Sequence, residues 1–448
     1  MTVNKITEGN IPKQLLSFFF PIFIGSLFQT LYNTVDSIIV GRFVGADALA
    51  AVGGTGLIMG LLIGFFMGLS SGGPVIISQY YGAKDYETIS KAVHTTVAMA
   101  VIGGLLISVL GEIFAGPLLR LIKLDPAIIG MSTLYLRLVF AGIVFFTIYN
   151  LGGGILRAIG DSKRPRNYLI LTCLMNIVLD LIFVLWLHMS VAGVAIATGI
   201  SIITSSILIM RDLLTTKDIY RVECRKIKID WPTFKEIMRI GLPSGGTYLA
   251  YTLSNLVIQS AINSFGANTT AAFVAFGKLD NVIFMIQGAF GMSVTTFVGQ
   301  NFGAKKLSRV RESTRTGMIM CVSAIAVISS AMYIFTPHLI SLFAKEYEVI
   351  NIGSAILHIC APFYFSYCFV EIFSGAIRGS GQAFMPMSIS LITICLFRCL
   401  WVFILVPIIG RTIDNIVWCY PVSWMLAALC FTIYYLIYRK KFTVPDPA

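Results

Sequence analysis

The chain has 448 residues, of which 57% are hydrophobic and only 12% are charged, with a net charge of +12. Soluble domains carry roughly 25% charged residues, so this composition excludes a water-soluble globular protein and predicts a polytopic membrane protein. The apolar runs last about 20 residues or more and do not alternate with a period of two, which predicts spanning helices and not a β-barrel.

Twelve apolar segments are expected to span the membrane, six on each side of a polar stretch at residues 211–233. We therefore predict an N-terminal six-helix bundle over residues 1–213, a cytoplasmic linker over 214–232 and a C-terminal six-helix bundle over 233–448. In chain order the segments cover residues 14–39, 49–80, 92–115, 127–155, 167–187, 191–210, 234–262, 269–298, 313–335, 349–376, 387–409 and 415–438.

The positive net charge has two explanations, a nucleic-acid partner or membrane topology. Most Lys and Arg residues fall in the terminal segments and in alternate loops, the polar stretch at 211–233 among them. This distribution is the one that the positive-inside rule requires. We therefore predict that both termini are cytoplasmic and that no nucleic acid is bound.

Two stretches of the chain repeat one another. Residues 45–84 begin with Gly-Ala and end with Gln-Tyr-Tyr-Gly-Ala-Lys; residues 266–305, which lie 221 positions later, begin with Gly-Ala and end with Gln-Asn-Phe-Gly-Ala-Lys. Because each half has an even number of spans, both halves have the same orientation. They are expected to be related by a pseudo-two-fold axis along the membrane normal, with a site inside or between the halves.

Charged side chains inside predicted spans are costly, which makes them candidate functional residues. Asp36 lies in the first span, Asp180 lies in the fifth span one turn after Asn176, and the sixth span contributes Thr198. Two carboxylates, a carboxamide and a hydroxyl are hard oxygen ligands that suit a small cation or a shared proton. The sequence therefore predicts a cation or proton site, with no metal site beyond Na⁺ at these four residues.

Other interpretations of these acids stay open. Asp36 could face water near the outer end of its span, and Asp180 could be a structural hydrogen-bonding group. Fifteen residues before Asp36, Pro21 removes a backbone hydrogen bond in the middle of an apolar run, so it is predicted to be a hinge in the first span.

A substrate cavity is predicted beside the acids. Gln29 and Tyr32 share a helical face with Asp36. Tyr135 and Met175 belong to an aromatic and methionine-rich set that would form an adaptable surface for flat lipophilic cations. For each of these side chains, ordinary packing against the core or lipid is the alternative.

The second half is charged differently. Lys278 and Asp280 lie in the eighth span, Glu371 in the tenth and Arg398 in the eleventh. These four side chains could neutralise one another, form a second ion site or contact a charged substrate.

Several motifs occur in a fixed order along the whole chain: Pro21, the run Gln-Thr-Leu-Tyr-Asn-Thr-Val-Asp at 29–36, and loop motifs at 79–84, 156–161 and 299–305. Together they resemble the multidrug and toxic compound extrusion (MATE) family of prokaryotes. The resemblance implies cation-coupled efflux of organic compounds by two six-helix bundles.

The resemblance also implies roles for single residues. The family's cation site matches Asp36, Asn176, Asp180 and Thr198. Its neighbouring polar residues match Gln29, Tyr32 and Asn150, and its first-span bend matches Pro21. Glu371 matches one member of an acidic pair found in some members, but the seventh span has no acid beyond Glu236 at its start.

We therefore predict an antiporter of the bacterial cytoplasmic membrane that exports lipophilic, often cationic compounds by alternating access, driven by Na⁺ or H⁺. Its expected partners are membrane lipid and small organic substrates; it is expected to be a monomer, to be no enzyme, and to need no cofactor except the coupling ion. The alternatives are a flippase for lipids or lipid-linked sugars, an intramembrane enzyme and a channel.

Overall fold

A computed structural model describes residues 6–122 and 124–442. Helices joined by short loops make up this described part, which contains no β-strand. Eleven of its helical segments are long and apolar enough to cross a membrane. The prediction of an all-α polytopic membrane protein is therefore confirmed.

The seventh predicted span, which is not among these eleven, corresponds to α9 (Trp231–Asn263), which at 33 residues is long enough to cross a bilayer. Polar side chains such as Ser254, Asn255 and Gln259 interrupt its apolar residues, and the helix is absent from the eleven most apolar spans. This span therefore places amide and hydroxyl groups at membrane depth.

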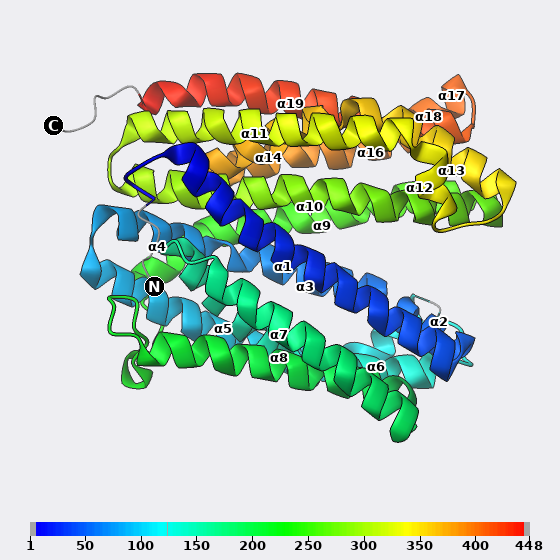
Figure 1. Ribbon diagram of the computed structural model, residues 1–448, viewed down its shortest axis with the longest axis horizontal. Coiled ribbons are helices and arrows are strands. Elements are labelled where there is room, and N and C mark those ends of the chain that lie inside the picture. Colours follow the sequence, from blue (N-terminus) through cyan, green and yellow to red (C-terminus); the bar gives the residue numbers. More distant parts are fainter. Residues whose placement is uncertain (1–5, 123, 443–448) are drawn as a thin grey trace. The chain divides into compact units, whose positions relative to one another are not determined.

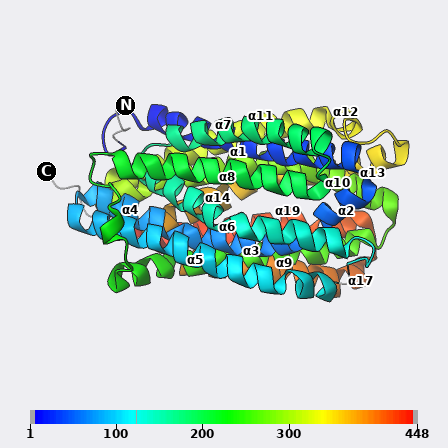
Figure 2. The ribbon, with the colours of Figure 1, turned by 90° about the horizontal axis from the view of Figure 1, so that it is seen from below.

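The described residues of the first half form α1 to α8, most of which are labelled in Figure 1. They are α1 (Ile11–Ile39), α2 (Ala46–Gly54), α3 (Gly56–Ser70), α4 (Gly72–Ala83), α5 (Tyr86–Leu121), α6 (Ile129–Ala158), α7 (Lys163–Leu181) and α8 (Ser190–Thr215). Helix α5 packs on α6, and α8 packs on both α6 and α7 (Figure 1 and Figure 2). These contacts bring the third, fourth, fifth and sixth spans together.

The second half begins with α9 and continues through shorter and longer helices. They are α10 (Ala267–Gly303), α11 (Leu307–Ile334), α12 (Thr336–Ser341), α13 (Tyr347–Cys360), α14 (Tyr364–Gly379), α15 (Phe384–Ser390), α16 (Phe397–Leu400), α17 (Val406–Ile409), α18 (Ile413–Val417) and α19 (Cys419–Tyr438). Helix α14 packs on α10 and α19. Helices α15, α16 and α17, with the π-helical turns between them, form one span from Phe384 to Ile409.

The second span differs between the two copies of the repeat. In the first copy it is divided into α2, α3 and α4, whereas in the second copy α10 runs unbroken for 37 residues. The divisions fall at Thr55 and Ser71, whose hydroxyls donate to Val52 O at 2.7 Å and Gly68 O at 2.6 Å in their own chain segment. Such hydroxyls compete with the helical ladder, and the neighbouring glycines weaken it further.

The chain forms two compact units, and two helices pass from one unit to the other. The N-terminal unit contains residues 20–242, and the C-terminal unit contains residues 6–19 and 243–442. Helix α1 changes unit next to Pro21, and α9 changes unit at Pro243; both prolines lie inside their helices. Each proline removes a backbone hydrogen bond at the place where its helix leaves one unit.

The segment before Pro21 is built into the C-terminal unit. Phe19 stacks on Phe290 with ring centroids 4.1 Å apart, and Phe18 meets the edge of Phe297 at 6.2 Å. The guanidinium of Arg309 donates to the carbonyl oxygens of residues 6 and 9 at 3.2 and 3.1 Å. The segment is thus held by both aromatic packing and charge-assisted hydrogen bonds.

The first turns of α9 are built into the N-terminal unit in a different way. A Cβ placed on Gly72 would lie 2.2 Å from Ile237 O, and one placed on Gly241 would lie 2.2 Å from Leu69 O. Two glycines therefore allow the backbones to touch. The Tyr80 hydroxyl also donates to the Glu236 carboxylate at 2.9 Å.

We expect Gly72→Ala to destabilise the protein by about 1–3 kcal/mol, because the added methyl group would overlap the backbone of α9. Gly60→Ala is the matched control: nothing lies within 4 Å of its added Cβ. Thermal unfolding of both purified variants checks the prediction, and equal melting temperatures would contradict the close backbone contact.

Candidate functional site

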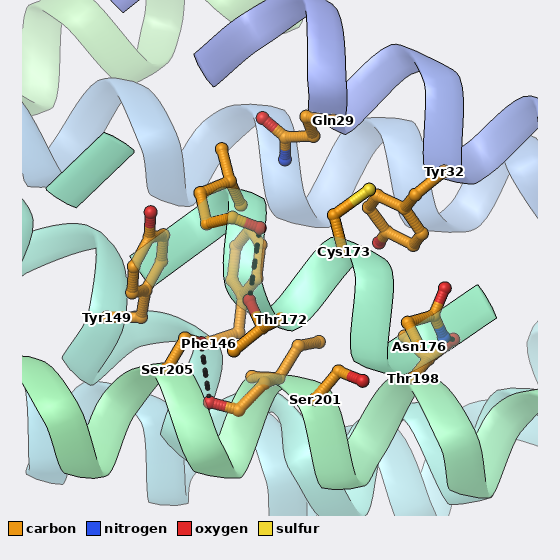
Figure 3. A pocket seen from close by; sticks show the side chains of 12 residues that line it. Gln29, Tyr32, Phe146, Tyr149, Thr172, Cys173, Asn176, Thr198, Ser201 and Ser205 are labelled. Atoms are coloured by element: carbon orange, nitrogen blue, oxygen red, sulfur yellow. Dashed lines mark hydrogen bonds between the residues drawn. The ribbon is translucent and has the colours of Figure 1, made fainter. Parts of the chain in front are cut away.

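The N-terminal unit contains a pocket between α1, α6, α7 and α8, with about 440 Å³ of empty space that includes open solvent. Its lining combines aromatic rings with hydroxyl and amide groups (Figure 3). The polar side chains include Gln29, Tyr32, Tyr149, Thr172, Ser201 and Ser205. At one end, Asn176 and Thr198 complete the wall.

Asn176 connects three helices at this end of the pocket. Its side chain is 1% exposed. With the amide oriented so that both of its ends are satisfied, Nδ2 donates to Asp36 Oδ1 at 3.0 Å and Oδ1 accepts from the Thr198 N–H at 3.3 Å. The amide on α7 thus joins the carboxylate on α1 to the backbone of α8.

Asp180 is completely buried beside this group. Its side chain is 0% exposed, and neither carboxylate oxygen has a hydrogen-bond donor within the described structure. Asp36 lies within hydrogen-bonding reach of Asp180, so the two carboxyl groups face one another. A buried carboxylate without a donor is strongly unfavourable unless a proton or a cation compensates its charge.

Two tyrosines complete the surroundings of the acids. Tyr32 on α1 and Tyr135 on α6 lie near both Asp36 and Asp180. The structure therefore brings together the four residues predicted as the cation or proton site, and it places two of the predicted cavity tyrosines against them. Oxygen atoms of carboxylate, amide and hydroxyl groups are ligands that hard monovalent cations accept.

The other predicted cavity residues are distributed differently. Gln29 and Tyr32 line the pocket. Asn150 donates its amide to Phe146 O of its own helix at 2.9 Å, and Met175 is half-buried on α7; neither is among the lining residues.

Sequence reasoning missed the hydroxyl groups of the pocket. Ser201 and Ser205 follow Thr198 on one face of α8, and Ser201 is 6% exposed with no hydrogen-bond partner for its hydroxyl in the described structure. Their spacing of three and four residues was visible in the sequence. Isolated Ser and Thr residues in spans bond so often to their own helix that the pattern carried little weight.

The predicted charges of the second half do not form one network. Lys278 is exposed on α10. Asp280 accepts a hydrogen bond from the Tyr364 hydroxyl at 2.7 Å, whereas Glu371 lies beside Gly291 and within electrostatic reach of Arg378. Arg398 interacts electrostatically with Asp280, and no ion pair within 4 Å joins them in the described part of the chain. The charges therefore divide into separate clusters.

No group of three or more His, Cys, Asp or Glu side chains that could hold a metal ion occurs among the described residues. The candidate site is instead a pair of carboxyl groups with an amide and a hydroxyl, next to a pocket of mixed aromatic and polar character. This combination suits a monovalent cation or a proton on one side and an organic molecule on the other.

The sequence profile of the MatE family matches residues 21–182 and 243–404, one match in each half of the chain. The chain belongs to this family, the MATE transporters. The match confirms the predicted family. MATE proteins are membrane transporters and not enzymes, so membership speaks against the enzyme alternative at the level of the family.

Relatives are similar to this MATE protein over nearly its whole length. It is 28% identical over 449 residues to the probable multidrug resistance protein YoeA of Bacillus subtilis, covering 98% of this chain and 97% of that protein. It is 20% identical over 433 residues to the multidrug export protein MepA of Staphylococcus aureus, covering 96% and 95%.

A solved structure shows the same fold. A MOP superfamily transporter from Pyrococcus furiosus superposes with a TM-score of 0.93 at 22% identity, covering 99% of this chain and all of the other. The similarity extends across both repeats.

We expect Asn176→Ala to destabilise the protein by about 1–3 kcal/mol, because the Asp36 carboxylate and the α8 backbone would both lose a buried partner. In a double-mutant cycle, Asn176→Ala and Asp36→Ala should be coupled by more than about 0.5 kcal/mol, because the Asn176 amide donates to the Asp36 carboxylate at 3.0 Å. Thr204→Val is the control, since that hydroxyl bonds to Ile200 O of its own helix. Additive effects in thermal unfolding of both pairs would contradict the contact.

Proposed function

We propose that this MATE protein is a cation-coupled antiporter that exports lipophilic, often cationic organic compounds, and that the N-terminal unit contains its coupling site. The observation that carries the proposal is Asp180, a fully buried carboxylate with no donor for either oxygen in the described structure. Such a group favours a partner that can arrive and leave, and Na⁺ and H⁺ are both suitable.

Binding of the cation would change the forces between three helices. Without it, Asp36 on α1 and Asp180 on α7 repel one another in a medium of low dielectric constant. With it, both carboxyl groups, the Asn176 amide and the Thr198 hydroxyl attract the same charge. Cation binding therefore draws α1, α7 and α8 together, and its loss lets them separate.

The same residues connect the coupling site to the substrate pocket. Asn176 and Thr198 line the pocket and also belong to the group around the acids. Any cation that reorients these side chains changes the polar end of the pocket. By linkage, a substrate that reorients them must change the affinity for the cation by the same factor. This reciprocity is the physical requirement for exchange of one ligand against the other.

The named relatives support the direction of transport and the class of substrate. One is described as a probable multidrug resistance protein and another as a multidrug export protein. We propose the bacterial cytoplasmic membrane as the location, with both termini in the cytoplasm, and a monomer as the transporting unit. A cavity of aromatic rings and adaptable polar groups agrees with substrates that differ in shape.

Asp36→Asn and Asp180→Asn are each expected to lower coupled transport at least 10-fold, because a neutral amide no longer attracts the cation. The assay follows efflux of ethidium, a lipophilic cation, in reconstituted vesicles under a Na⁺ gradient and a proton gradient imposed separately. Full transport driven by either gradient in both variants would refute the coupling site.

Asp47→Asn is the matched control for this experiment. Asp47 is an exposed acid in the first turn of α2 and lies outside the pocket lining. Transport by this variant should equal that of the wild type. The gradient that sustains wild-type efflux identifies the coupling ion.

Pro21 is proposed as the hinge of α1 because the helix passes from one compact unit to the other beside it. Pro21→Ala restores a backbone hydrogen bond and stiffens the helix by up to about 3 kcal/mol. We expect slower ethidium efflux with unchanged cation-dependent stabilisation. Pro12→Ala, near the N-terminal end of the same helix, should not slow efflux, because the N–H of that position has no intrahelical partner.

A further inference from the structure

The C-terminal unit contains a buried guanidinium that the coupling mechanism does not use. Arg398 lies in the span from Phe384 to Ile409, which has the highest mean hydropathy of the eleven spans at 2.5, and its side chain is only 3% exposed. A fixed positive charge at such a place is costly and requires compensation.

Arg398 joins three helices of its unit. Its Nε donates to Ser423 Oγ on α19 at 2.9 Å, and its Nη1 donates to Asn255 Oδ1 on α9 at 3.3 Å. The guanidinium carbon lies 4.4 Å above the centre of the Tyr420 ring, which adds a cation–π contact. The carboxyl group of Asp280, which accepts a hydrogen bond from the Tyr364 hydroxyl, lies within electrostatic reach of the guanidinium.

The three connected helices are the counterparts of the helices that form the coupling site. Helix α9 is the first span of its half, α16 belongs to the fifth and α19 to the sixth; α1, α7 and α8 have these places in the first half. At the repeat distance of 221 residues, Asn176 corresponds to Phe397, so Arg398 lies one residue from the counterpart of the central amide.

The oxygen groups around the two positions also correspond in kind. In the N-terminal unit a carboxamide and a hydroxyl accompany the carboxyl pair, as Asn176 and Thr198 do. In the C-terminal unit Asn255 and Ser423 supply a carboxamide and a hydroxyl, and Asp280 supplies the carboxylate. An amide and a hydroxyl, the kinds of group that accompany the carboxyl pair in one unit, bind the guanidinium in the other, and Asp280 acts on it at longer range.

We propose that Arg398 is a built-in cation that permanently occupies the repeat-equivalent of the coupling site. The C-terminal unit then has its first, fifth and sixth spans locked together at all times and exchanges no cation at this place. This inference rests on the proposed function of the N-terminal unit for its comparison, and it makes its own prediction: removing the guanidinium creates a site for a small monovalent cation.

The test is thermal unfolding of the purified full-length protein and of Arg398→Ala, in choline chloride and with low millimolar guanidinium chloride or NaCl added. We expect Arg398→Ala to melt roughly 5 °C or more below the wild type, and added guanidinium to restore at least half of this loss. The wild type, whose site is filled, should gain nothing from guanidinium. A variant that guanidinium fails to stabilise overturns the proposal, whatever its response to Na⁺.

Arg411→Ala is the matched control in the same unit. Arg411 also donates to a serine, Ser264, at 2.8 Å and lies 5.9 Å from the centre of the Phe265 ring, but its side chain is exposed. Guanidinium should not stabilise this variant. An equal response in both variants would show a general salt effect and overturn the proposal.

If Arg398→Ala does not fold, Arg398→Lys and Arg398→Met decide the question. Both side chains are long and flexible, and only lysine is charged, so the lysine variant must melt at the higher temperature. A methionine variant of equal or greater stability refutes the built-in cation, since it would show that packing alone is required.

Two sets of measurements distinguish the built-in cation from the proposed coupling site. Stabilisation of the wild type by Na⁺, and its loss in Asp180→Asn, report on the N-terminal unit. Rescue of Arg398→Ala by guanidinium, and its persistence in the double variant with Asp180→Asn, report on the C-terminal unit. If Na⁺ does not stabilise the wild type but guanidinium still rescues Arg398→Ala, the proposed coupling site is refuted and the built-in cation is supported.

Discussion

The burial of the Asp180 carboxylate is the constraint on which the rest of the N-terminal unit depends. A charged oxygen pair inside an apolar bundle has only two stable conditions, protonated or cation-bound, and each condition requires a different arrangement of the surrounding dipoles. The Asn176 amide, held between Asp36 and the α8 backbone, is the group best placed to report which condition exists. Because this amide also lines the pocket, the electrostatics of one carboxylate affect one wall of that pocket.

The two halves of the protein illustrate how a duplicated scaffold acquires unequal parts. Both units use the same order of spans, and both have a proline where the first span changes unit. The second span is divided in one copy and continuous in the other, and the packing of the docked segments relies on glycine contacts in one unit and stacked phenylalanines in the other. Backbone topology is conserved between the copies, while side-chain chemistry is free to diverge around it.

Much of the fold could be predicted from the sequence because a membrane permits few backbone structures. Long apolar runs must be helical, since every backbone group in lipid needs an internal partner, and this reasoning located even the polar span α9. The acids of the site were equally visible, because an ionisable residue within a span is rare. The breaks at Thr55 and Ser71 were not predicted, since they depend on competition between hydroxyl and backbone bonds.

Contacts between side chains required the structure. The sequence placed Lys278, Asp280, Glu371 and Arg398 in three spans, but their charges alone did not say which would meet. In the structure Lys278 is exposed and Arg398 is enclosed by Asn255 and Ser423. Uncharged polar residues such as these are common in membrane spans, so the sequence does not indicate which of them bind a charged group. For the same reason the hydroxyls of Ser201 and Ser205 were not predicted to line the pocket.

The docking of residues 6–19 in the C-terminal unit has a consequence for biosynthesis. The carbonyl of Gly9 and the guanidinium of Arg309 that binds it are 300 residues apart in the chain. At 5–20 residues per second, translation separates them by roughly 15 to 60 s. During that interval the first half of the protein is in the membrane, but the part of the C-terminal unit that binds residues 6–19 has not yet been made. The N-terminal unit must therefore persist in the bilayer with α1 incompletely anchored until the segment around Arg309 has been synthesised.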